Sequence, residues 1–74
     1  MPKLGVFSGK EVCALLSEHG FAQVRTRGSH AVMQKRESDG STRTVPVPLH
    51  TAVRKGTLNS IIRQSGLDRS LFLK

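Results

Sequence analysis

The 74-residue sequence contains no tryptophan or tyrosine, and its only aromatic side chains are three phenylalanines. Phe7, Phe21 and Phe72 all fall where an apolar residue is expected to pack, so we do not expect bases to stack on exposed rings. The single cysteine, Cys13, excludes an internal disulfide framework and is typical of a reducing cytoplasm. We expect Cys13 to be a small buried apolar residue.

Acidic residues and long apolar runs are also scarce. The five Asp and Glu residues are scattered, which argues against a multi-carboxylate metal site. His19, His30 and His50 lack the spacing of zinc motifs, so we expect neither a metal nor another cofactor. No run approaches the roughly 20 apolar residues of a membrane span, and the N-terminus lacks a signal-peptide core. We therefore expect a cytoplasmic protein with no membrane partner.

Basic residues, in contrast, are abundant. Twelve Lys and Arg against five Asp and Glu give a net charge of +7. This excess indicates a polyanionic partner: nucleic acid first, an acidic protein second and an anionic membrane surface third. The length predicts a single domain over residues 1–74.

The first helix is predicted from its two ends. Ser8 and Glu11 have the spacing of a capping box, in which each side chain accepts a backbone hydrogen bond from the other residue. Gly20 supplies a left-handed stop, with Phe21 placed to fold back on the helix end. These signals predict a helix over residues 9–19.

Three strands are predicted next. Ala22 and Val24 alternate with polar residues, which predicts a half-buried strand with a basic outer face. A turn at residues 28–29 leads into a second strand over residues 30–35, and periodicity leaves open which way His30 points. The Asp-Gly turn at residues 39–40 leads into a third strand over residues 42–47.

The third strand is predicted to lie at the sheet edge, and a second helix follows it. Pro46 and Pro48 cannot donate to a ladder, which favours an edge position. Thr57 is the expected N-cap of the second helix, and Gly66 its stop. Asp68 is expected to cap a final turn that buries two apolar side chains, Leu71 and Phe72. The predicted apolar stripe of this helix consists of Leu58, Ile61 and Ile62.

Together these elements predict an α+β fold in the order α-β-β-β-α. Two amphipathic helices would cover one face of a three-stranded antiparallel sheet, and the other face would be left to solvent or a partner.

The histidines are the residues best suited to chemistry beside so many cations. RNA can be cut without a metal when its own 2′-hydroxyl attacks the adjacent phosphate, which requires an acid or base near neutrality and nearby cations. His30 follows a turn, and Arg25, Arg27 and Lys35 are near it in the hairpin. The alternative is that His30 is an ordinary polar strand residue. His19 is expected to interact with the helix dipole.

A second cationic segment precedes the second helix. Arg54 and Lys55 are followed by a glycine that allows close approach, so the segment could hold a phosphate at the helix N-terminus. A solvated charged loop is the alternative. His50 lies in the preceding loop, and loops often carry functional residues.

The order of five short motifs resembles the HicA (YcfA-like) toxins. The motifs are Gly20-Phe21, Arg27-Gly28-Ser29-His30, Val45-Pro46-Val47-Pro48 with His50, Lys55-Gly56-Thr57-Leu58, and Ile61-Ile62-Arg63-Gln64-Ser65-Gly66-Leu67. The resemblance implies a bacterial or archaeal mRNA interferase with a fold similar to double-stranded-RNA-binding domains. It implies that His30, in the Gly-Ser-His motif, is the catalytic residue, with no metal needed. It also implies a HicB-like antitoxin that masks the RNA-cutting surface. Leu49, between the second proline and His50, leaves the role of His50 open.

The first hypothesis is therefore a toxin that cleaves mRNA and so inhibits translation, with His30 as general acid or base. Its expected RNA-binding residues are Arg25, Arg27, Ser29, Lys35, Arg54 and Lys55. The alternative is a non-catalytic RNA-binding module of similar shape, although such a domain spans about 16 base pairs and this chain has short loops. A small interaction protein for an acidic partner is a third reading.

Overall fold

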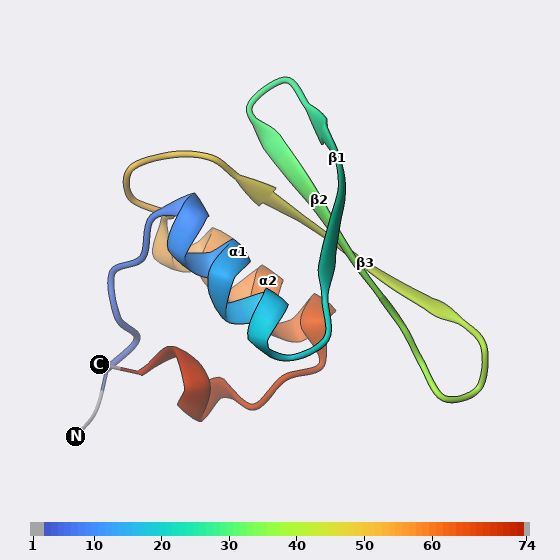
Figure 1. Cartoon of the computed structure of the whole chain (residues 1–74). Helices are drawn as coiled ribbons and strands as arrows, with labels where there is room; N and C mark the ends of the chain where they lie inside the picture. Colours follow the sequence, from blue (N-terminus) through green and yellow to red (C-terminus); the bar gives the residue numbers. More distant parts are fainter. Residues whose placement is uncertain (1–2, 74) are drawn as a thin grey trace.

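Two helices lie on one side of a three-stranded antiparallel sheet in the computed structural model, which describes residues 3–73 (Figure 1). The central strand, β2, pairs with β1 on one side and with β3 on the other. The elements in chain order are α1 (Gly9–Glu18), β1 (Ala22–Arg27), β2 (His30–Arg36), β3 (Thr42–Pro48), α2 (Lys55–Ser65) and the short 3₁₀ helix η1 (Arg69–Phe72). The predicted α+β order and the edge position of β3 are confirmed.

Both ends of α1 form as the sequence predicts. The Glu11 amide donates to the Ser8 hydroxyl at 3.1 Å, and the Ser8 amide donates to the Glu11 carboxylate at 2.8 Å. Gly20 has a φ of +94°, and the Phe21 amide donates back to the Leu16 carbonyl at 3.1 Å. The capping box and the glycine stop therefore fix where α1 begins and ends.

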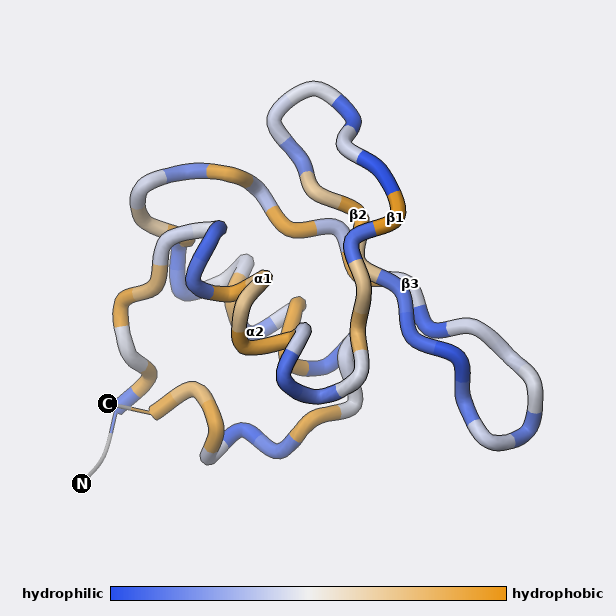
Figure 2. Tube along the Cα trace, in the orientation of Figure 1, coloured by the Kyte–Doolittle hydropathy of each residue, from blue (hydrophilic) through white to orange (hydrophobic). Residues whose placement is uncertain are grey.

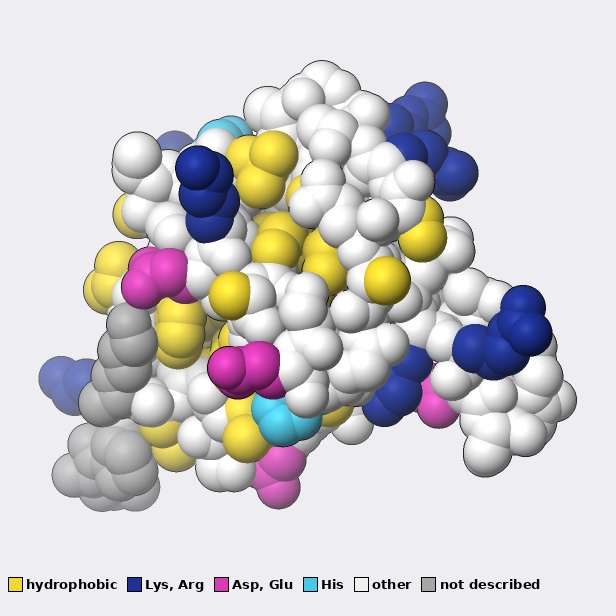
Figure 3. Space-filling model, viewed as in Figure 1, with side chains coloured by type: hydrophobic (Ala, Val, Ile, Leu, Met, Phe, Trp, Pro, Cys, Tyr) yellow, Lys and Arg dark blue, Asp and Glu magenta, His cyan; other side chains and the backbone are white. Residues whose placement is uncertain are grey.

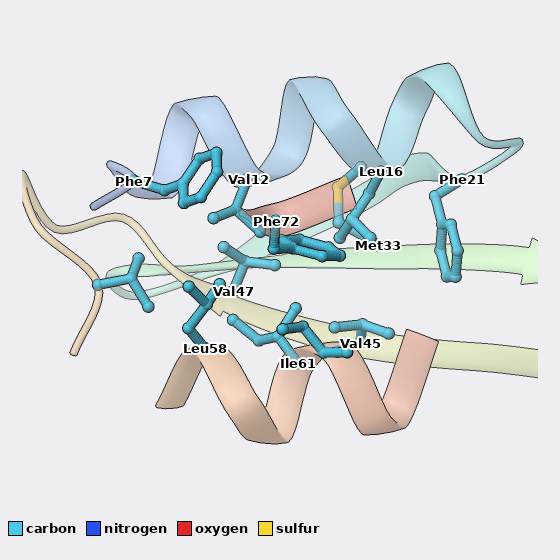
Figure 4. Close-up of a cluster of buried hydrophobic side chains, with 12 residues drawn as sticks. Phe7, Val12, Leu16, Phe21, Met33, Val45, Val47, Leu58, Ile61 and Phe72 are labelled. Carbon is cyan, nitrogen blue, oxygen red and sulfur yellow. The ribbon is translucent and has the colours of Figure 1, made fainter. Parts of the chain in front are cut away.

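The hydrophobic core lies between the two helices and one face of the sheet (Figure 4). Met33 pairs with Val45 and Ala31 with Val47, so these four side chains share the face turned toward the helices. Figure 2 shows hydrophobic stretches along the helices, the C-terminal segment and the middle of the sheet, whereas the hairpin ends are mostly hydrophilic. The core cluster consists of Phe7, Val12, Leu16, Phe21, Met33, Val45, Val47, Val53, Leu58, Ile61, Ile62 and Phe72.

β1 differs from the half-buried strand that alternation predicts. All six of its residues are exposed, and Val24 keeps 47% of its surface in solvent. The register shifts between Gln23 and Arg25, so a bulge takes Val24 out of the simple alternation. β1 is also an edge strand with little of the helical layer over it (Figure 1). The prediction of a half-buried first strand was therefore wrong.

The second helix begins earlier than predicted. Arg54, not Thr57, is the N-cap, because the Leu58 amide already donates to the Arg54 carbonyl at 2.8 Å. Gly66 ends the helix with a φ of +71°, as expected. The Asp68 carboxylate caps η1 by accepting from the Ser70 amide. η1 buries Phe72 but leaves Leu71 exposed. The predicted burial is therefore correct for Phe72 and wrong for Leu71.

Candidate functional site

The face of the sheet turned away from the helical core carries basic side chains and one histidine. Arg27 pairs with His30, and Arg25 pairs with Val32 on the same strand. Residues paired directly across strands share a face, and Arg25, Arg27 and His30 are all exposed. The register therefore settles the direction of His30: it belongs to this outer face, which we call the open face.

A hollow of about 300 Å³ lies where the open face meets α2. His30 contributes from the start of β2, and two prolines of β3 form the floor beside it. The opposite wall is one side of α2, built from residues at helical spacing. The connecting loop between β3 and α2 closes the end of the hollow. The lining residues are His30, Pro46, Pro48, His50, Arg54, Thr57, Ser60, Ile61 and Gln64.

The loop that carries His50 is held by backbone hydrogen bonds on both sides. The Leu49 amide donates to the Ser29 carbonyl at 2.6 Å, which ties the loop to the turn before His30. The Gly9 amide donates to the His50 carbonyl at 2.9 Å, which ties it to the start of α1. These bonds use main-chain atoms only, so the position of His50 does not depend on its imidazole.

The charge around the hollow is positive. Arg54 is part of its lining, and among the described lining residues none is acidic. Four of the five acidic side chains have structural partners elsewhere: Glu37 pairs with Arg43 at 2.7 Å, Glu11 caps α1, and Asp39 and Asp68 accept hydrogen bonds in turns. Hydrogen bonds from Ser41 lower the pKa of Asp39. Similar bonds from Ser70 lower the pKa of Asp68, so both remain ionised in their turns. The hollow is thus suited to an anionic guest.

Comparison with protein families identifies the chain. The family described as the HicA toxin of bacterial toxin–antitoxin matches residues 9–67, which is most of the sequence. The chain belongs to the HicA toxin family. It is therefore a toxin of a toxin–antitoxin system, and its partner is an antitoxin. No curated protein matches the sequence.

The structure brings some of the predicted RNA-binding residues of this toxin together and separates others. Arg25, Arg27 and His30 share the open face, and Arg54 lines the hollow beside them. Lys35 lies on the opposite face of β2, with its ammonium 5.8 Å from the centre of the Phe21 ring. Lys55 lines a separate hollow that shares no residue with the first.

Three other residues that the sequence singled out, Ser29, His19 and Cys13, have positions in this toxin that are at least partly structural. Ser29 occupies the hairpin turn next to Gly28, whose φ is +58°, and its carbonyl holds the His50 loop. His19 is the C-cap of α1 and does not line the hollow. Burial raises the pKa of the Cys13 thiol, which is half-buried against the core, so the thiol stays protonated at neutral pH.

Sequence reasoning did not foresee the α2 wall of the hollow. Thr57, Ser60 and Gln64 follow one another at three- and four-residue spacing, so they form a polar stripe beside the apolar one. This polar stripe is the sequence signal from which the wall could have been predicted.

Across residues 3–73, no three His, Cys, Asp or Glu side chains gather as a metal site would require. The helices of the described chain are also too short or too polar to cross a bilayer.

Proposed function

We propose that this toxin is an endoribonuclease that cleaves mRNA without a metal ion and thereby inhibits translation. The observation that carries the proposal is the shared position of His30 and Arg54 in one hollow, beside the arginines of the open face. Membership of a toxin family supports it, because inactivation of mRNA is a direct way to arrest growth.

The chemistry requires only groups that this surface offers. The 2′-hydroxyl of a ribonucleotide attacks the neighbouring phosphorus and the 5′-oxygen leaves, so a proton must be removed at one oxygen and supplied at the other. The imidazole of His30 serves as general acid or base, the role that histidine side chains most often fill in proton transfer. The guanidinium of Arg54 stabilises the additional negative charge on the phosphate oxygens in the transition state.

RNA would be held chiefly through its phosphates. Arg25 and Arg27 project from the open face next to the hollow, and Figure 3 shows basic side chains projecting from both hairpins. Phe7, Phe21 and Phe72 are all at least 93% buried, so no aromatic ring is available for base stacking among the described residues. Ser29 lies within reach in the adjoining turn. Lys35 and Lys55 would add positive charge only at the flanks.

The same surface is also our candidate binding site for the antitoxin. We propose a HicB-like protein with acidic side chains that covers the open face and the mouth of the hollow, in the cytoplasm where mRNA is present. Such a partner would compete with RNA for Arg25, Arg27 and Arg54, since one cationic surface cannot contact both anions at once.

His30→Ala tests the proposal. Because His30 is exposed, the variant should keep the circular dichroism spectrum and melting temperature of the parent and should still bind RNA. Its rate of cleavage of a purified single-stranded RNA should fall by about 10²–10⁴-fold, the usual contribution of a general acid or base. Growth arrest on expression should be lost as well.

His19→Ala provides a matched control, since it removes an imidazole outside the hollow and should cut RNA like the parent. A parent protein that binds RNA but never cuts it would instead support the non-catalytic binding module. A His30→Ala protein that cuts RNA at the parental rate would remove His30 from the mechanism.

A further inference from the structure

A second histidine lines the hollow that holds His30. His50 lies 20 residues away in the sequence, in the loop between β3 and α2, yet it lines the same 300 Å³ space. Arg54 lines it too. Two histidines and an arginine, with no acidic residue among the described lining residues, form a cluster whose chemistry matches a phosphodiester.

The fold holds the backbone segments that carry the two histidines next to each other. His30 begins β2 and pairs with Pro48, and only Leu49 separates Pro48 from His50. The Leu49 amide is bonded to Ser29, the residue directly before His30, at 2.6 Å. The chain segments that carry the two imidazoles are therefore bonded to each other within one residue of each histidine.

Cleavage by the 2′-hydroxyl requires two proton transfers on opposite sides of the phosphorus, which a single imidazole is poorly placed to carry out. The attacking 2′-oxygen and the leaving 5′-oxygen lie on opposite sides of the phosphorus in an in-line displacement. A base must accept the proton from the 2′-hydroxyl while an acid donates one to the 5′-oxygen, so two separate groups serve better than one.

We propose that His50 is a second catalytic residue, which acts together with His30 across one phosphate bound by Arg54. This inference rests on the proposed function. The neutral imidazole of the pair takes the proton from the 2′-hydroxyl as the O2′–P bond forms. The protonated imidazole gives its proton to the 5′-oxygen as the P–O5′ bond breaks. The products are a 2′,3′-cyclic phosphate and a 5′-hydroxyl, with no change of oxidation state and no further reactant.

The decisive experiment compares two substrates in three single variants. The substrates are a short single-stranded oligoribonucleotide and the same oligomer with sulfur in place of the bridging 5′-oxygen at the cleavage position. A thiolate leaves without a proton, so loss of the general acid no longer matters with the sulfur substrate, whereas loss of the general base still does. The variants are His30→Ala, His50→Ala and His19→Ala.

With the ordinary substrate, His30→Ala and His50→Ala should each lose about 10²–10⁴-fold in rate, and His19→Ala should match the parent. With the sulfur substrate, only one of the two deficient variants should recover to within about tenfold of the parent, because only one of them lacks the acid. Recovery would identify that residue as the acid and the other as the base. Melting curves of all variants should coincide, since His50 is held through its main-chain carbonyl.

Several results would overturn the inference. A His50→Ala protein that cuts the ordinary substrate at the parental rate would overturn it. Recovery of both deficient variants with the sulfur substrate, or of neither, would overturn it as well. A parent protein that cuts neither substrate contradicts the proposed function itself. A parent that cuts both, with His30→Ala deficient and His50→Ala unaffected, contradicts only the role of His50.

Discussion

At the scale of single residues, Gly9 shows how closely the start of α1 approaches the candidate site. A Cβ at this position would overlap the Pro48 carbonyl oxygen and would lie 2.7 Å from the Leu49 Cα. Both neighbours are backbone atoms and cannot rotate away. The same residue donates its amide to His50. Gly9 therefore allows the helix and the loop to touch, and the loop takes its position from that contact.

We expect Gly9→Ala to destabilise the protein by about 1–3 kcal/mol, the usual cost of overpacking a filled site. Gly56→Ala is the matched control, because a Cβ there has no neighbour within 4 Å and the residue lies in α2. Alanine at that helical position should stabilise by up to about 1 kcal/mol. Urea unfolding followed by circular dichroism measures both. Equal midpoints for the two variants would show that the α1–loop contact is looser than described.

At the scale of elements, the sheet separates its cations between two faces. Arg25 and Arg27 of β1 share the open face with His30, whereas Lys35 of β2 lies over Phe21 on the other face. Alternation along β2 accounts for the difference, since His30 and Lys35 are an odd number of residues apart. Proximity in sequence grouped Lys35 with His30, but the pleat of the strand places them on opposite faces.

This arrangement predicts unequal effects of removing single cations. Arg27→Ala should weaken binding of single-stranded RNA several-fold and reduce the salt slope by about 0.7, because one phosphate contact is lost. Lys35→Ala should leave RNA affinity nearly unchanged, since its ammonium lies near Phe21. Fluorescence anisotropy with a labelled oligoribonucleotide at several salt concentrations measures both. A larger loss in Lys35→Ala than in Arg27→Ala would place the RNA on the other face.

The elements themselves could be predicted because their signals are local. Ser8 with Glu11, and the left-handed glycines at 20 and 66, mark helix ends within a few residues of chain. The start of α2 was missed because the N-cap is Arg54, which makes no capping hydrogen bond within the described chain. The hollow could not be predicted, because it depends on how α2 packs beside β3, a contact between segments that the sequence pattern does not relate.

At the scale of the whole molecule, the distribution of charge matters more than its total. The net charge of +7 was evident from the sequence, but its placement was not. Acidic side chains are engaged in helix caps, turns and one ion pair. Arginines, in contrast, lie on the open face and at the hollow. A polyanion is therefore attracted by the whole chain but is best accommodated at one side, where His30 and His50 lie.

The affinity for RNA should consequently be dominated by phosphate contacts and depend steeply on salt. If four or five cations engage single-stranded RNA, the plot of log K against log salt should have a slope of about −3. Raising the salt from about 50 to 200 mM should then weaken binding by about 60-fold. The double variant Arg25→Ala with Arg27→Ala should have a slope closer to zero by about 1.4, because two phosphates lose their partners. Anisotropy titrations of the parent and the double variant give both slopes. Affinity that stays constant over this range would mean that base edges, and not phosphates, hold the RNA.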